Sequence, residues 1–172
     1  MRIGLLSDTH GHFDAGLTRL FAGCDRIVHA GDVVGPEVLL LLSSLAPVTA
    51  VRGNNDLGAL GEGLPEEAEV ALEGLKGLVL HELGRPERPL PSARRLIELR
   101  RPDLVVYGHS HSPAVAVVGG VLFINPGGAG RRRFHLPRTA AILTVNGRSA
   151  RVEFADLDAG LAEWGSPSEV DL

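Results

Sequence analysis

Short apolar runs alternate with helical patterns in the first third of the chain. Three of these runs have the length and the Val, Ile and Leu content of buried strands. Two segments between them have apolar residues at helical spacing, and good helix-starting residues open them, Asp14 in one and Pro36 in the other. The pattern predicts a β-α-β-α-β unit with parallel strands and right-handed crossovers. Its strands cover 2–6, 26–30 and 47–52, and its helices cover 14–23 and 36–46.

Strand patterns separated by Gly, Pro and Asn turn signals dominate the rest of the chain. One helical pattern, over 92–102, is stopped by Pro102. Two apolar runs around Leu75 and Lys76 predict a hairpin or two neighbouring strands. We therefore expect one α/β domain over residues 1–172, in which two sheets pack together with helices outside them. The strands predicted here cover 69–74, 77–82, 103–111, 114–120, 121–128, 139–145 and 149–157.

Four segments lack a regular pattern. Residues 57–66, 84–91 and 128–138 are expected to link elements, and residues 158–172 are expected to form an acidic C-terminal tail. Trp164 is a candidate anchor for that tail. No internal repeat is present, so the sequence predicts a single copy of one fold.

Composition narrows the functional class. The 172 residues suffice for one domain with a sizeable core. The formal net charge is −4, whereas a nucleic-acid surface needs a basic excess, so we expect no nucleic-acid polymer as a partner. The N-terminal apolar run is too short for a signal sequence, and the longest unbroken one, Val38 to Leu42, is too short for a membrane span. The single cysteine, Cys24, excludes a disulfide framework and a Cys-based metal site and fits a reducing cytosol. We expect a cytoplasmic protein without membrane contact.

Five predicted strands end in polar residues that can bind metal ions. Ligand sites in α/β folds gather beyond the carboxyl ends of strands, so neighbouring strands would bring these side chains together. Two carboxylates, four imidazoles and one amide oxygen suit Mn²⁺, Zn²⁺ or Fe better than Mg²⁺ or Ca²⁺. Seven ligands suffice for two ions about 3.5–4 Å apart that share a bridging carboxylate. The candidates are Asp8, His10, Asp32, Asn54, His81, His109 and His111.

Each motif alone also has a plainer interpretation. The "DTH" segment fits a turn, "AGD" fits a helix cap before Pro36, and His81 in an apolar strand is typical of a core histidine with a satisfied hydrogen bond. The pair His109 and His111 is more specific, because two histidines at i and i+2 after a strand rarely serve packing. The whole set in this order therefore favours a metal centre.

The segments "SDTHG", "AGDVVGPE", "AVRGNND", "VLHE", "VVYGHSHSP" and "FINPGG…LPR" resemble the calcineurin-like metallophosphoesterase superfamily. The best match is its small bacterial and archaeal phosphodiesterase branch. The resemblance implies a four-layer α-β-β-α sandwich, a small phosphodiester substrate and two divalent ions. Mn²⁺ is the first expectation, and Zn²⁺, Fe, Ni²⁺ and Co²⁺ are alternatives. It also implies that Asp8, His10 and His111 hold the first ion, that Asn54, His81 and His109 hold the second, and that Asp32 bridges them.

The implied mechanism is in-line attack on phosphorus by a metal-bridging hydroxide. An alkoxide leaves poorly unless it is protonated, and histidine is the usual donor. Family members with "GNH" have this histidine directly after the metal-binding asparagine, where this chain has Asn55. An amide is no general acid at neutral pH, so Asn55 is expected at most to donate a hydrogen bond to a phosphate oxygen. We therefore expect a phosphodiesterase that favours good leaving groups. His12 is the candidate substitute acid, although loop histidines are more often exposed or supporting.

Several features stay open at this level. The family's His-Gly-His is "HEL" here, which bears on access to the second ion, and Glu82 either supports a ligand histidine or points to solvent. Asp56 and Asn125 are expected to support the site or to stabilise turns. The arginines of 130–138 meet a substrate phosphate, a partner's acidic patch or only solvent. The alternatives to a phosphodiesterase are a non-catalytic scaffold, like the family's retromer subunit, and a phosphomonoesterase. The apolar C-terminal strands leave open a homo-oligomer.

Overall fold

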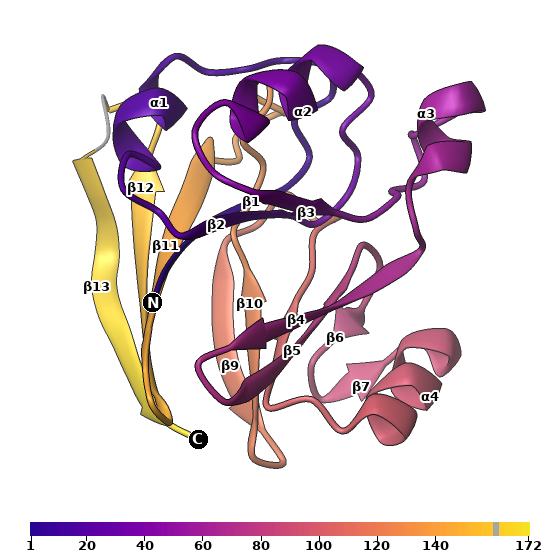
Figure 1. Cartoon of the computed structure of the whole chain (residues 1–172), viewed down its shortest axis with the longest axis vertical. Helices are drawn as coiled ribbons and strands as arrows, with labels where there is room; N and C mark the ends of the chain where they lie inside the picture. Colours follow the sequence, from indigo (N-terminus) through magenta and orange to yellow (C-terminus); the bar gives the residue numbers. More distant parts are fainter. Residues whose placement is uncertain (160–161) are drawn as a thin grey trace.

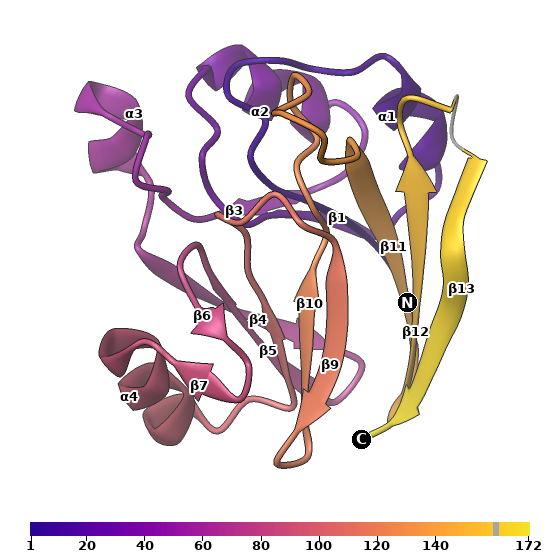
Figure 2. The same ribbon diagram turned by 180° about the vertical axis from the view of Figure 1, so that it is seen from behind.

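Two β-sheets pack face to face in the computed structural model, which describes residues 1–159 and 162–172, and helices lie outside the sheets (Figures 1 and 2). The first sheet contains β1 (Arg2–Leu6), β2 (Arg26–His29), β3 (Val48–Ala50), β11 (Thr139–Asn146), β12 (Ser149–Asp156) and β13 (Ala162–Asp171). The second contains β4 (Glu67–Leu72), β5 (Leu75–Leu80), β8 (Leu104–Val106), β9 (Ala114–Val118) and β10 (Val121–Asn125). The strand orders are β13-β12-β11-β1-β2-β3 and β4-β5-β8-β10-β9.

The helices are α1 (Gly16–Leu20), α2 (Pro36–Ser43), α3 (Gly58–Gly63) and α4 (Pro91–Arg100). The first is shorter than predicted: the Asp14 carboxylate accepts a hydrogen bond from the Gly16 N–H before the helix starts. Two segments expected to be linkers contain regular structure, namely α3 and the small ribbon of β6 (Gly84–Arg85) and β7 (Arg88–Pro89). The glycine-rich sequence of α3 has low helix propensity, which explains why no helix was predicted there. No helix in the described part of the chain is long and apolar enough to cross a membrane.

Alternating side chains divide the core into layers. On β1, Leu5 packs between the two sheets, whereas Leu6 packs in the cluster beside α1 and α2. On β8, Leu104 faces the inter-sheet core, whereas Val105 packs with Ala93 of α4. Each buried aliphatic side chain of this kind contributes about 1.5–3 kcal/mol to stability. The predicted four-layer α-β-β-α sandwich is thus confirmed.

Parallel pairing places the carboxyl ends of the central strands at common sheet edges. The strands β1, β2 and β3 run parallel, as do β5, β8 and β10. The hydrogen-bonded register of β1 and β2 continues into the loops after them, because Asp8 N–H donates to Gly31 O and His10 N–H donates to Asp32 O, each at 3.0 Å. The loops after β1 and β2, which carry Asp8, His10 and Asp32, are therefore hydrogen-bonded to each other as the strands are.

The pattern predicts no strand after residue 157, yet the structure has β13 paired antiparallel with β12. Val170 packs against the inter-sheet core, and its burial supplies a reason for the strand to add to this edge. The charged residues that made the segment resemble a tail are typical of an edge strand. The side chains of residues 162–167, including the candidate anchor Trp164, lie outside the described part of the structure.

Candidate metal centre

All seven predicted ligands lie in one group beyond the carboxyl ends of β1, β2, β3, β5 and β8. Each has a ligand atom within 3.6 Å of a ligand atom of its neighbour, so the side chains form an unbroken series. The tertiary fold therefore brings together residues from five separate strand ends. In spatial order the series is His109, Asn54, His81, Asp32, His10, His111 and Asp8.

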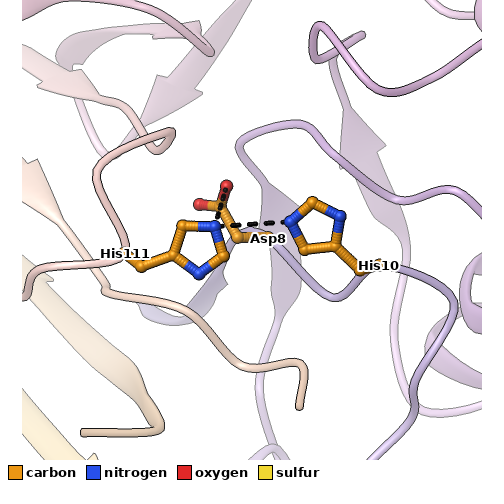
Figure 3. Close-up of side chains that lie close together, drawn as sticks. All are labelled: Asp8, His10 and His111. Atoms are coloured by element: carbon orange, nitrogen blue, oxygen red, sulfur yellow. Dashed lines mark hydrogen bonds and ion pairs between the residues drawn. The ribbon is translucent and has the colours of Figure 1, made fainter. Parts of the chain in front are cut away.

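The three residues predicted for the first ion converge at the buried end of the series (Figure 3). His111 Nε2 lies 3.3 Å from both Asp8 Oδ1 and His10 Nε2, and the two imidazole rings are stacked. Asp8 Oδ1 is buried and accepts no hydrogen bond from the described residues. A buried carboxylate oxygen without a donor is costly, so this atom fits a cation ligand.

The three residues predicted for the second ion lie at the open end. Asn54 Oδ1 is 3.1 Å from His81 Nε2 and 3.0 Å from His109 Nδ1. The imidazoles of His81 and His109 are perpendicular, with their centroids 5.3 Å apart. His81 is buried, whereas Asn54 and His109 are exposed, so this end of the series faces solvent.

Asp32 lies between the two groups. Its Oδ2 atom is 3.6 Å from His10 Nε2 and 3.5 Å from His81 Nε2. Burial by itself would raise the pKa of this carboxyl, but hydrogen bonds from His81 and Asn55 hold the pKa well below its usual value. Asp32 is therefore an anion at neutral pH, and it lies between a histidine of one predicted group and a histidine of the other.

The backbone at these strand ends is strained. Five of the seven candidates have positive φ, a conformation that is uncommon for residues other than glycine and costs on the order of 1–3 kcal/mol each. The sharp turns aim successive side chains into the same space, and such strain clusters at functional sites. The five are Asp8, His10, Asp32, His109 and His111.

Two glycines let the loops approach the ligands closely. A Cβ atom on Gly53 would lie 2.2 Å from Asp32 Oδ1, and a Cβ atom on Gly31 would lie 2.6 Å from His81 Nδ1. Gly31 also has a φ of +91°. Each glycine directly precedes a candidate ligand in sequence, but the ligand to which it gives space comes from another strand end.

Hydrogen bonds outside the series set the orientation of its imidazoles. His81 Nδ1 lies 2.7 Å from Ala30 O, so this nitrogen carries a proton and Nε2 is the nitrogen that faces the centre. His109 Nε2 lies 3.2 Å from Glu82 Oε1, which directs Nδ1 towards Asn54. Glu82 was expected either to support a ligand histidine or to point to solvent, and in the structure its carboxylate contacts the candidate ligand His109.

Two buried polar residues hold the loops themselves. Asn125 Nδ2 donates to Gly108 O and to Ser110 Oγ, each at 3.0 Å, and so supports the loop of the two histidines from below. The Asp56 carboxylate accepts hydrogen bonds from the N–H groups of Val34 and Gly53, at 2.6 and 2.8 Å. Asp56 thereby joins the loop after β2 to the loop after β3.

The two candidates for a catalytic role lie in different places. Asn55 donates two hydrogen bonds to Asp32, from its N–H to Oδ1 at 2.8 Å and from Nδ2 to Oδ2 at 2.6 Å. Its amide thus lies beside the central carboxylate. His12 is half-buried, and within the described residues its side chain makes no hydrogen bond or ion pair with the seven candidates. Burial by itself would raise the pKa of the Asp14 carboxyl, but the contacts of Asp14 with Arg138 and Gly16 and, least of all, the nearby His12 imidazole hold this pKa below its usual value.

Sequence reasoning missed two residues near the centre. His29 is fully buried beside Thr9, with Nε2 2.9 Å from Thr9 Oγ1, and burial lowers its pKa to about 4. An apolar strand gives no signal that separates such a histidine from a ligand. The Nη1 atom of Arg133 lies 3.1 Å from His111 Nε2. The sequence showed only that its loop is rich in arginine, which does not indicate which arginine contacts the site.

A cavity of about 250 Å³ adjoins the open end of the series. Asn54, His81 and Glu82 form part of its wall, together with Arg52 and Ser92. The replacement of the family's Gly-His by Glu82 and Leu83 therefore leaves space beside the second-ion residues. Substrate groups of moderate size fit a cavity of this volume.

The donor set and its geometry fit divalent transition metals. Two sets of three residues each have ligand atoms that all lie within 4.8 Å of one another. One set is Asp8, His10 and His111, and the other is Asp8, Asp32 and His81. Imidazole and carboxylate donors without thiolates suit Mn²⁺, Zn²⁺ or Fe. A cation would also stabilise the buried Asp8 Oδ1, which accepts no hydrogen bond from the described residues.

Comparisons with known proteins agree with this geometry. A family model described as a calcineurin-like phosphoesterase superfamily domain matches residues 1–148. A phosphodiesterase of Methanocaldococcus jannaschii is 32% identical over 143 residues, which are 74% of this chain and 83% of the relative. The solved phosphoesterase YfcE from E. coli is 26% identical, with 99% of each chain covered and a TM-score of 0.71. Wild-type Vps29 from Entamoeba histolytica, complexed with zinc, is 22% identical, with 99% of each chain covered and a TM-score of 0.78, and this likeness shows the fold alone. The chain belongs to the calcineurin-like phosphoesterase superfamily, within its small bacterial and archaeal branch.

Proposed function

We propose that this protein is a dinuclear-metal-dependent phosphodiesterase. The observation that carries the proposal is the unbroken series of seven ligand side chains with Asp32 at its centre. Two divalent ions bound there would supply positive charge for the phosphoryl oxygens and a nucleophile derived from water near neutral pH. Mn²⁺ is the proposed metal, with Zn²⁺, Fe, Ni²⁺ or Co²⁺ as alternatives. Asp8, His10 and His111 would hold one ion, Asn54, His81 and His109 the other, and Asp32 both.

Residues around the series orient its histidines for metal binding. Ala30 and Glu82 hold one ring nitrogen of His81 and of His109, so that the other nitrogen of each ring faces the centre. The open end and the adjoining cavity leave room for the substrate, which we propose to be a small phosphodiester. We further propose that one domain spans residues 1–172 and that the protein works in the cytoplasm, where its single cysteine fits a reducing environment.

The leaving group decides the substrate preference. The Asn55 amide has no proton to release at neutral pH, and its Nδ2 donates to Asp32. We propose that Asn55 holds Asp32 and offers at most a hydrogen bond to a phosphoryl oxygen. His12 remains the candidate acid. If it protonates the leaving group, His12→Ala lowers turnover of alkyl diesters much more than turnover of nitrophenyl diesters, and equal losses would remove it from that role.

Hydrolysis of bis(p-nitrophenyl) phosphate with added Mn²⁺ tests the proposal. We expect two ions per chain by metal analysis, turnover that depends on them, and loss of the second ion in Asn54→Ala. The absence of turnover with Mn²⁺, Ni²⁺, Co²⁺ and Zn²⁺, in protein shown to bind two ions, would refute the proposed activity.

Two alternatives make different predictions. The first is a non-catalytic scaffold of the same fold, and fewer than one ion per chain after purification without chelator would favour it. A phosphomonoesterase would hydrolyse p-nitrophenyl phosphate faster than the diester. If position 55 governs this preference, Asn55→His raises the ratio of monoesterase to diesterase activity.

A further inference from the structure

Arg133 is the arginine of its loop that reaches the metal centre. Its Nη1 atom lies 3.1 Å from His111 Nε2, the same imidazole nitrogen that faces Asp8 and His10. The neighbouring Arg132 instead pairs with Asp158 at 2.6 Å, and Arg131 is exposed.

The ends of this loop are fixed, so the position of Arg133 follows from the fold. Gly130 N–H donates to Asp8 O at 3.1 Å, which joins the start of the loop to the strand end of a predicted ligand. At the other end, the Arg138 guanidinium donates to Gly130 O, Asp14 and Asp158, at 2.6, 2.6 and 3.2 Å. Between these anchors the Arg133 side chain is exposed and contacts the buried end of the series through His111.

The contact between Arg133 and His111 is incompatible with an ion on the same nitrogen. The lone pair of His111 Nε2 either accepts a hydrogen bond from the guanidinium or binds the ion, and the two positive charges repel each other. On the basis of the proposed function, an ion held by His111 therefore releases Arg133. The released guanidinium stays within reach of any anion that binds beside that ion.

We propose that Arg133 is a substrate-binding residue, which leaves His111 when the first ion binds and then pairs with the non-bridging phosphoryl oxygens of the substrate. The planar guanidinium matches two phosphoryl oxygens with two parallel hydrogen bonds, which a lysine cannot reproduce. The phosphoryl group would thus be bound both by the ions and by Arg133.

Inorganic phosphate, titrated calorimetrically into the Mn²⁺-loaded protein, tests this proposal. Charged hydrogen bonds of this kind correspond to a loss of about tenfold to 150-fold in phosphate affinity for Arg133→Ala. We expect Arg133→Lys to recover part of the loss and the exposed neighbour Arg131→Ala to bind phosphate within about twofold of the parent, since a scattered surface change has little effect. The diester KM should rise in Arg133→Ala. A thermal melt of each variant checks that it is folded.

Titration with Mn²⁺ alone supplies a readout that does not depend on activity. Arg133→Ala removes the cation that competes for His111, so its Mn²⁺ affinity should equal or exceed that of the parent, with unchanged stoichiometry. Weaker Mn²⁺ binding would show that Arg133 supports His111 and would overturn the proposal, as would unchanged phosphate affinity. If the parent hydrolyses the diester and either result is found, only the role of Arg133 fails. If the parent binds none of Mn²⁺, Ni²⁺, Co²⁺ and Zn²⁺, the proposed function and this inference fail together.

Discussion

The amide of Asn55 donates a 2.6 Å hydrogen bond to Asp32 Oδ2, and Asn55→Ala removes this bond alone. The second bond to Asp32 comes from the backbone N–H of the same residue, so it persists in the variant. A hydrogen bond to a charged group contributes about 1.5–3 kcal/mol, which corresponds to about tenfold to 150-fold in an equilibrium constant. Because Asn55 is exposed and solvent screens the interaction, we expect the lower end of this range, about a tenfold loss of Mn²⁺ affinity.

Calorimetric titration with Mn²⁺ measures the affinity, and diester turnover at saturating Mn²⁺ separates two roles of Asn55. If Asn55 acts only through Asp32, saturating metal restores kcat, whereas a hydrogen bond to a phosphoryl oxygen leaves kcat low. Leu57→Ala is a matched control, because Leu57 is exposed and lies two residues further along the chain. An Mn²⁺ affinity in Asn55→Ala equal to that of the Leu57→Ala control would refute the reasoning that Asn55 positions Asp32.

Three further perturbations test other parts of the structure. Gly31→Ala places a Cβ atom 2.6 Å from His81 Nδ1, so we expect bound metal to fall from two ions to one, measured by elemental analysis, and retention of both would contradict the close packing. Burial lowers the pKa of His29 from 6.5 to about 4, so the unfolded state binds more protons between these values and stability falls as the pH drops through this window. The shift corresponds to about 3 kcal/mol, and His29→Leu should remove that part of the difference between urea unfolding at pH 7 and at pH 4; an unchanged difference would exclude His29 as its source. Mn²⁺ at about 100 times its Kd should stabilise the folded protein by about 2.7 kcal/mol, and EDTA should reverse this effect. A melting temperature that changes with neither Mn²⁺ nor EDTA would argue against a metal site formed only in the folded state.

Local sequence patterns were sufficient to predict many of the strands and helices. The β-α-β-α-β order of the first third follows from apolar spacing, because the periods of helix and strand are properties of consecutive residues. Elements whose stability comes from distant contacts escaped prediction, namely the glycine-rich α3 and the edge strand β13. The strand β13 forms because β12 has an edge to which another strand can pair, and the sequence of residues 162–171 does not indicate that this edge exists.

The same division holds for the metal centre. Sequence alone determined the chemistry of the donors, since carboxylate, imidazole and amide groups after apolar runs are visible in the order of residues. Only the tertiary structure decided that His109 rests against Glu82, that Asn55 holds Asp32 and that Arg133 reaches His111. Each of these contacts joins residues more than 20 positions apart, so its formation depends on which strands pair and on how the two sheets pack together. A pattern of neighbouring residues contains no information about that packing, and this is why the ligands could be named before their partners.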